Sequence, residues 1–232
     1  LWSVPGCAMP GPLGPELLRG RAALLLDLDG TLLDTLPGLT AAVNAVLVEL
    51  QRPLATCQLV RSWVGNGVRT LLHRALTRAH HGRAQDALLT SALTLFEHHY
   101  GALRHTGCRP YPGTLSLLQG ARTAGIGLAC VTNKEAGHAQ ALLDATGLGA
   151  YFDTVIGGDT TAQIKPHPAP LQEALRRLAC RREDGLMVGD SAVDTRAARA
   201  AGVAVVTVRC GYGAPDPAWL PDAQIQSLEE LP

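Results

Sequence analysis

The sequence predicts an α/β protein built on a doubly wound parallel sheet, with a block of helices inserted after the first strand. Three observations lead to this prediction. Short apolar runs recur along the chain without polar alternation, which is typical of strands covered on both faces. Helical patterns separate most of these runs, as in a parallel sheet with crossover helices. Residues 36–106 show helical periodicity and contain no strand-like run.

The predicted strands and helices alternate along most of the chain. The strand-like runs are residues 23–28, 126–131, 154–156, 186–188 and 203–208. The helical patterns cover residues 114–124, 136–146, 170–179 and 192–201. Glycine stands near the end of three of these helices, in the stretches TAGIG, ATGLG and RAAGV, where a left-handed residue is favoured.

Residues 36–106 are expected to form a separate helical cap. Two apolar stripes with spacings of three and four run through this block: Leu39, Val43, Val46, Leu47 and Leu50 in the first, and Leu89, Leu93, Phe96, Tyr100 and Leu103 in the second. Because the block separates the first strand from the rest of the sheet, hinges are expected near residues 35–37 and 107–112. Residues 21–35 and 107–232 then form the α/β core.

Composition excludes several classes of protein. The 232 residues carry a formal net charge of zero, and the basic residues are dispersed, so we expect no nucleic-acid partner. No apolar run approaches the roughly 18 residues of a membrane span. Residues 1–20 begin with a stretch rich in proline and glycine, which predicts a disordered lead-in rather than a signal peptide. Six scattered cysteines without a C-x-x-C pair favour a cytoplasmic location.

Polar side chains gather where the predicted strands end, and ligands of open parallel sheets bind at this edge. The residues concerned are Asp27, Asp29, Thr31, Thr132, Asn133, Lys134, Lys165, Asp190 and Asp194. Buried carboxylates are costly unless they are paired, so these groups need a cation. The segment DLDGTLLD is not a calcium loop, because Gly30 is fourth from Asp27 and such a loop places its glycine sixth. Carboxylates, a hydroxyl and a lysine together can bind a metal ion and a phosphoryl group.

Four motifs stand in the order of one known family. DLDGT, VTN, a lysine before proline, and GDSAVD resemble the motifs of the haloacid dehalogenase superfamily of phosphotransferases, from Arg21 onward. The stretches WVGNGV and GGDTTAQIKPHPAPL and the tail GYG…SLEELP are similar to its phosphoglycolate phosphatases. This resemblance implies a Rossmann-like core with an inserted helical cap. It also implies a phosphatase that acts on a small phosphorylated metabolite, most simply 2-phosphoglycolate.

The resemblance implies roles for the acidic residues. Asp27 would be the nucleophile and form an aspartyl-phosphate, and Asp29 would protonate the leaving oxygen and then activate water. Mg²⁺ suits such an all-oxygen site, held by the Asp27 and Asp190 carboxylates and the Asp29 backbone carbonyl. Asp194 would orient a neighbouring lysine or a metal-bound water.

The resemblance also implies how the phosphoryl group is bound. Thr132 and the Asn133 amide would donate hydrogen bonds to phosphoryl oxygens, while Lys165 would pair with both Asp27 and the phosphoryl group. Thr132 and Asn133 follow one predicted strand and Lys165 comes in the loop after another, so the tertiary fold has to bring them together.

The segment RSWVGNGVR is the expected source of substrate specificity in the cap. Its glycine turn can approach a ligand closely, and its arginines can bind a carboxylate. The candidate substrate-binding residues are Arg61, Gly65, Asn66, Gly67 and Arg69. An ordinary turn between two helices, flanked by solvated arginines, explains the same pattern.

Two other functions stay open at this point. A sugar-phosphate phosphatase or phosphomutase would share the fold and the nucleophile, because only cap closure keeps water from an aspartyl-phosphate. A non-catalytic binding module is the more remote alternative, since fold alone does not define function. The sequence leaves open whether the protein is a monomer or a homodimer.

Overall fold

The computed structural model describes residues 17–213 and 216–231. Within these residues, the core sheet has six parallel strands in the order β5-β4-β1-β6-β7-β8. The strands are β1 (Ala23–Leu26), β4 (Gly127–Val131), β5 (Thr154–Ile156), β6 (Gly185–Gly189), β7 (Ala204–Val208) and β8 (Ala223–Ile225). Short 3-10 helices lie at Gly149–Tyr151, Arg182–Asp184 and Leu228–Glu230. The predicted fold class is confirmed.

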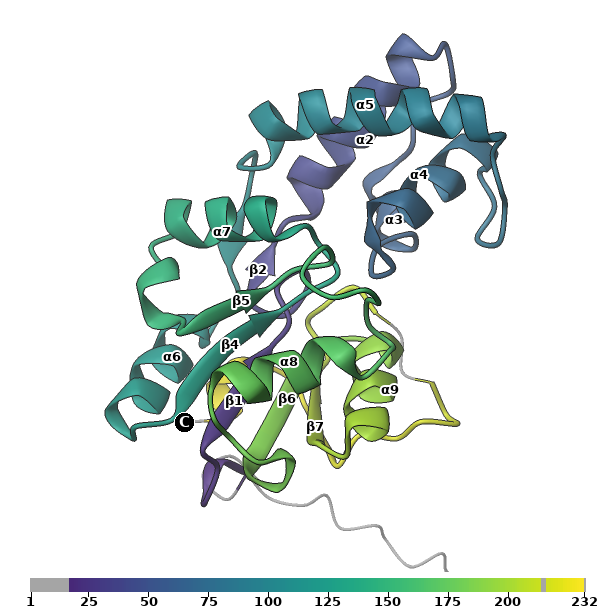
Figure 1. The fold of residues 1–232 in the computed structure, drawn as a ribbon. Coiled ribbons are helices and arrows are strands. Elements are labelled where there is room, and N and C mark those ends of the chain that lie inside the picture. The colour runs from purple at the N-terminus through teal and green to yellow at the C-terminus, as the bar shows by residue number, and fades with distance from the viewer. Residues whose placement is uncertain (1–16, 214–215, 232) are drawn as a thin grey trace, which may run out of the picture.

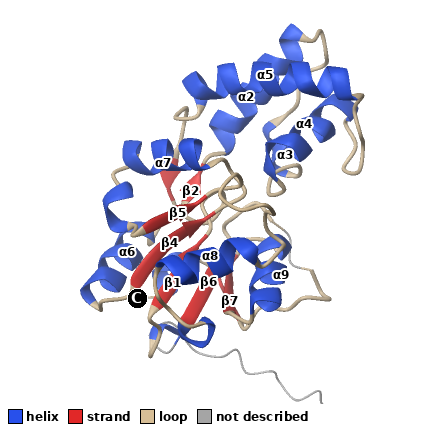
Figure 2. Ribbon diagram, viewed as in Figure 1, coloured by secondary structure: helices blue, strands red, loops and turns tan. Residues whose placement is uncertain are grey.

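Helices cover both faces of the sheet (Figures 1 and 2). Helices α6 (Thr114–Thr123) and α7 (Ala136–Ala145) pack on one face, and α8 (Ala169–Arg177) and α9 (Ala192–Ala201) pack on the other. Successive residues of a strand point to opposite faces, so a strand covered on both faces is apolar at every position. This arrangement accounts for the uninterrupted apolar runs in the sequence.

The central strand β1 shows this alternation directly. Leu24 and Leu26 belong to the apolar cluster under α6 and α7, whereas Ala23 and Leu25 belong to the cluster under α8 and α9. All four side chains are fully buried. The strand ends at Leu26, two residues before the predicted end, because the chain then enters a turn in which the Leu28 carbonyl accepts from the N–H groups of Leu32 and Leu33.

Three short strands were not predicted. β8 is a three-residue edge strand that contains Gln224, so it lacks a continuous apolar run. β2 (Leu33–Asp34) and β3 (Arg109–Pro110) pair antiparallel, with Leu33 opposite Pro110. These two strands connect the core to the helical insert and hold its two connections side by side.

The insert is entirely helical between β2 and β3 in the structure. It contains α2 (Leu36–Glu49), α3 (Cys57–Arg61), α4 (Gly67–Thr77) and α5 (Asp86–Leu103), with α2 and α5 lying side by side (Figure 1). Its apolar cluster is separate from the two clusters of the sheet. We call residues 36–106 the cap, and this division of the chain stays a prediction.

Most of the expected N-terminal lead-in, together with Cys7, lies outside the described residues. Within it, Leu17 and Leu18 pack against the core. The five described cysteines are free. In the described ranges, no helix has the length and apolar character needed to span a membrane.

Candidate active site

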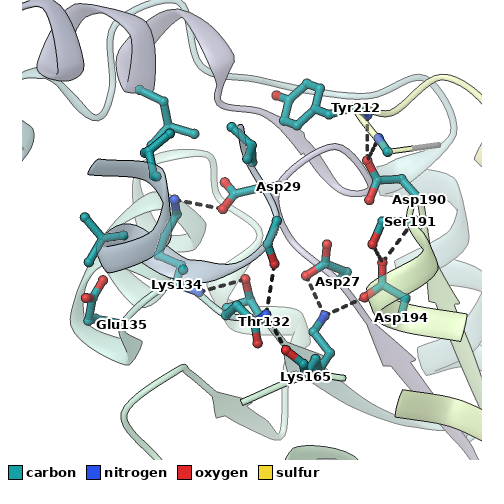
Figure 3. Close-up of a pocket in the computed structure, with 18 of the residues that line it drawn as sticks. Asp27, Asp29, Thr132, Lys134, Glu135, Lys165, Asp190, Ser191, Asp194 and Tyr212 are labelled. Carbon is teal, nitrogen blue, oxygen red and sulfur yellow. Dashed lines mark hydrogen bonds and ion pairs between the residues drawn. The ribbon is translucent and has the colours of Figure 1, made fainter. Parts of the chain in front are cut away.

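The sheet topology gathers the predicted site residues at one edge (Figure 3). β1 lies between β4 and β6, so the residues that follow these three parallel strands are neighbours in space. Asp27 and Asp29 follow β1, Thr132 follows β4, and Asp190 follows β6. Lys165 comes from the loop between β5 and α8, and all five residues line one pocket.

Lys165 lies at the centre of the buried network. Its Nζ donates to Asp27 Oδ1 at 2.8 Å, Asp194 Oδ1 at 2.7 Å and the Val131 carbonyl at 2.6 Å. Burial by itself would lower the pKa of Lys165. The neighbouring Asp194 and Asp27 carboxylates raise it by more than burial lowers it, so the pKa lies above its ordinary value. The ammonium group has three N–H donors, and all three are used within the protein.

Asp194 uses both carboxylate oxygens within the protein. Its Oδ1 accepts from Lys165, and its Oδ2 accepts from the Ser191 hydroxyl at 2.7 Å and the Ser191 N–H at 3.1 Å. The Ser191 contacts form a capping box at the start of α9. Asp194 is therefore held in place by Ser191 and in turn holds the Lys165 ammonium group.

Asp27 and Asp190 each keep one oxygen without a hydrogen-bond partner among the described residues. Asp27 Oδ1 accepts from Lys165, which leaves Oδ2. Asp190 Oδ2 accepts from the N–H groups of Tyr212 at 2.6 Å and Gly213 at 3.0 Å, which leaves Oδ1. Burial raises the pKa of both carboxyl groups, and the Asp194 charge adds to the effect.

The charge and chemistry of this cluster fit a divalent cation. Ligand oxygens of Asp27, Asp190 and Asp194 lie within 4.8 Å of one another, and all three residues are buried. The single ammonium of Lys165 pairs with both Asp27 and Asp194, so the three carboxylates together carry an excess of buried negative charge. An all-oxygen donor set with this charge suits Mg²⁺. The Asp27 carboxylate and the unpartnered Asp190 oxygen would hold such an ion.

Gly30 is required by the geometry around Asp190. Its φ angle is +84°, in the left-handed region that favours glycine. A Cβ at this position would lie 2.3 Å from Asp190 Oδ2 and 3.1 Å from the Tyr212 ring. The glycine of DLDGT thus lets the loop after β1 approach Asp190 closely.

Asp29 points from the core loop toward the cap. Its Oδ1 accepts a hydrogen bond from the Thr35 hydroxyl, just before α2. Its Oδ2 forms an ion pair with Lys134 Nζ at 2.9 Å. The carboxylate is therefore held by the hinge on one side and by a lysine on the other, and Figure 3 shows the contact with the lysine.

Lys134 lines the pocket, although sequence reasoning assigned it no role. It is buried, and its Nζ also donates to the Tyr100 hydroxyl of α5 at 2.9 Å. Burial lowers the pKa of Lys134, but Asp29 and Tyr100 more than offset this, and the pKa lies above its ordinary value. Its place as the third residue of TNK, after a predicted strand, was the available signal.

Thr132 and Asn133 both line the pocket. The Asn133 side-chain amide donates to the Gly65 carbonyl at 2.9 Å and the Lys165 carbonyl at 2.8 Å. Both of its N–H donors are thus used to join the glycine turn of the cap to the core. The Asn133 backbone N–H remains as the group that can donate to a phosphoryl oxygen.

The structure brings only part of the predicted cap site to the pocket. Gly65 and Gly67 line it, but Asn66, Arg61 and Arg69 do not. The Asn66 side chain accepts from Arg74 at 3.1 Å, and Arg69 is exposed. Arg61 donates to the Gly211 carbonyl of the core, and its guanidinium lies over the Tyr212 ring, so its charge is used beside the pocket and not in its lining. The expected arginine anchor therefore lacks support from this geometry.

Tyr212 is a second pocket residue to which sequence reasoning assigned no role. Its hydroxyl accepts from the N–H groups of Thr35 at 2.7 Å and Leu36 at 3.0 Å, and donates to Asp34 at 2.8 Å. It thus satisfies free donors at the start of α2, where no side chain of the helix does so. Since its own N–H holds Asp190, Tyr212 links the hinge to the acidic cluster.

Comparison with known proteins gives consistent results. Residues 24–208 match the family model described as haloacid dehalogenase-like hydrolase. A phosphoglycolate phosphatase (plasmid) of Cupriavidus necator is 42% identical over 212 residues, which cover 90% of this chain and 91% of that protein. A phosphoglycolate phosphatase of Nitrosococcus oceani is 38% identical over 217 residues, or 93% and 96% of the two chains.

Solved structures share the architecture. A predicted phosphoglycolate phosphatase from Haemophilus somnus superposes with a TM-score of 0.85 at 32% identity, covering 91% of this chain and 96% of that one. A mutant of CbbY from Rhodobacter sphaeroides, in complex with xylulose-(1,5)bisphosphate, has a TM-score of 0.75 at 25% identity, covering 90% and 96%. The similarity extends over the core and the cap alike.

Proposed function

The chain belongs to the haloacid dehalogenase-like hydrolase family, and on this basis we propose that it is a Mg²⁺-dependent phosphatase that hydrolyses 2-phosphoglycolate. One observation supports the chemistry most directly. Asp27 lies beside Lys165 and Asp190 in a buried cluster with excess negative charge, it lines the pocket, and one of its oxygens has no hydrogen-bond partner among the described residues. The names of the relatives support the substrate.

The first half of the reaction transfers the phosphoryl group to Asp27. The free Asp27 oxygen attacks phosphorus, and the bond from phosphorus to the leaving oxygen breaks with its electron pair on that oxygen. Asp29 donates a proton to this oxygen, which leaves as the hydroxyl of glycolate. Lys165 holds the other Asp27 oxygen, so the nucleophile cannot rotate away.

The second half returns the enzyme to its starting state. Asp29, now a carboxylate, accepts a proton from a water molecule that attacks the phosphorus of the aspartyl-phosphate. The bond from phosphorus to the Asp27 oxygen breaks, and inorganic phosphate leaves. Throughout, the charge of Lys165 and the Thr132 hydroxyl stabilise the phosphoryl oxygens, since both residues line the same pocket as Asp27.

Mg²⁺ would be held by the Asp27 and Asp190 carboxylates and the Asp29 backbone carbonyl. When bound, it would neutralise the repulsion between an anionic nucleophile and a dianionic phosphate. Lys165 alone does not supply this charge, because it is already shared between Asp27 and Asp194. The free thiols of the described cysteines are consistent with the cytoplasmic location that we propose.

The proposal is tested by measuring free phosphate released from a panel of phosphomonoesters in the presence of Mg²⁺. The panel contains 2-phosphoglycolate, glucose 6-phosphate, glucose 1-phosphate and 4-nitrophenyl phosphate. We expect the highest kcat/KM for 2-phosphoglycolate. An isomerised sugar phosphate without free phosphate would instead indicate a mutase, and no turnover of any ester would contradict the proposed reaction.

A further inference from the structure

We propose that Lys134 binds the carboxylate of the substrate and thereby selects phosphate esters that carry a carboxylate next to the ester carbon. This inference rests on the proposed function and adds a specificity-determining residue to it. Lys134 comes from the core, although substrate specificity was expected to come from the cap arginines.

Lys134 is the cation of the pocket that still has a donor to offer. Among the described residues that line the pocket, the positively charged side chains are Lys134 and Lys165. Lys165 uses its three N–H donors on Asp27, Asp194 and the Val131 carbonyl. Lys134 uses one on Asp29 and one on Tyr100, and its third N–H has no acceptor among the described residues.

The position of Lys134 matches the place where the substrate carboxylate has to lie. If Asp29 protonates the leaving oxygen, that oxygen lies within hydrogen-bond reach of the Asp29 carboxyl group. In glycolate the carboxyl carbon is two bonds from this oxygen, about 2.4 Å away. Lys134 Nζ lies 2.9 Å from Asp29 Oδ2. A cation in contact with the acid is therefore also within reach of the leaving group's carboxylate.

The cap holds Lys134 in this position and limits the access of water. The Tyr100 ring stacks on Phe96 with centroids 5.0 Å apart and packs edge-on against His138 at 5.0 Å. Tyr100 is itself buried, so its hydroxyl is a fixed acceptor for Lys134. Apolar side chains of the cap, including Leu39 and Leu71, line the same pocket. A charge pair formed in such surroundings is stronger than one in water.

The alternative is that Lys134 only positions Asp29. The two roles differ in their dependence on the substrate. A residue that only positions the acid affects every ester to the same degree, whereas a carboxylate-binding residue acts only on esters that carry the carboxylate. The matched substrates are 2-phosphoglycolate and its amide, 2-phosphoglycolamide, which has nearly the same shape but no negative charge at that end.

The experiment measures kcat/KM for both substrates in the wild type, Lys134→Met and Lys134→Arg, with Mg²⁺ present. We expect the wild type to prefer the acid over the amide, and Lys134→Met to reduce this preference by about 10- to 100-fold, the scale of a charge-assisted hydrogen bond. Lys134→Arg should retain part of the preference because it keeps the charge. Arg69→Met, which removes an exposed cap cation outside the pocket lining, should leave the preference unchanged.

Three results separate the possible failures. Equal losses on acid and amide in Lys134→Met would show that Lys134 only positions Asp29, and the inference would be wrong. Equal kcat/KM for acid and amide in the wild type would overturn it without any variant, even if Lys134→Met does not fold. No hydrolysis of 2-phosphoglycolate by the wild type, with turnover of other esters, would refute the proposed substrate itself.

Discussion

Replacing Gly30 by alanine should weaken Mg²⁺ binding although it replaces no ligand of the metal. The new Cβ would lie 2.3 Å from Asp190 Oδ2, roughly 1 Å short of ordinary van der Waals contact. Because two backbone N–H groups hold that oxygen, Asp190 cannot yield without losing them. The φ angle of +84° adds a strain of about 1–2 kcal/mol for a residue with a Cβ.

These two costs can be separated by a matched control. Gly125 has a φ angle of +71°, and a Cβ there would meet nothing within 4 Å. Gly125→Ala therefore reports the backbone strain alone. We expect Gly30→Ala to be destabilised by about 1–3 kcal/mol more than this control, the scale of an overpacked site. The difference measures the contact with Asp190.

The assay is a Mg²⁺ titration of phosphate release, combined with thermal unfolding of each variant. Gly30→Ala should raise the Mg²⁺ concentration for half-maximal activity by about 10- to 100-fold, the usual effect of disturbing a residue that supports a metal ligand. Gly125→Ala should leave it within twofold of the wild type. If Gly30→Ala behaved like Gly125→Ala in both measurements, the assignment of Asp190 as a metal ligand held by this loop would be refuted.

Four further predictions follow from the site. Asp29→Asn should slow hydrolysis of 2-phosphoglycolate by about 10²-fold or more, and less for 4-nitrophenyl phosphate, whose leaving group needs no acid; equal losses would argue against this role. EDTA should abolish activity, Mg²⁺ should restore it and Ca²⁺ should substitute poorly, whereas full activity after metal removal would contradict the site. Burial raises the pKa of Asp27 to about 8 and of Asp190 to about 7, from an ordinary value of 3.8. Between the ordinary and the raised values, the folded metal-free protein keeps protons on these groups that the unfolded chain has released. Its melting temperature in EDTA should therefore fall between pH 6 and pH 8, and an increase would contradict the raised pKa values. Tyr212→Phe removes the hydroxyl that caps α2 and should lower stability by about 1–3 kcal/mol in denaturant unfolding, whereas an unchanged value would show that water replaces it.

The sheet could be predicted from the sequence because burial on both faces leaves a direct signal. Strands such as β6 and β7 are apolar at nearly every position, and glycines mark the helix ends between them. The edge strand β8 and the pair β2–β3 leave no such signal, because two or three residues show no periodicity. Their pairing depends on where the rest of the chain places them.

The site was predictable only where its residues follow strands. Asp27, Lys165 and Asp190 were found because parallel strands end at one edge. The contacts of Lys134 with Tyr100, 34 positions earlier in the chain, depend on how the cap packs on the core. The orientation of the cap likewise decides that Arg69 is exposed and does not line the pocket.

Asp27→Asn tests whether Asp27 is the nucleophile of a phosphatase. An amide cannot attack phosphorus, so we expect the variant to release no detectable phosphate from 2-phosphoglycolate with Mg²⁺, while the wild type does so readily. Its unfolding transition should stay cooperative, which shows that the loss is chemical. A variant free of deamidation that keeps activity within about tenfold of the wild type would contradict the account.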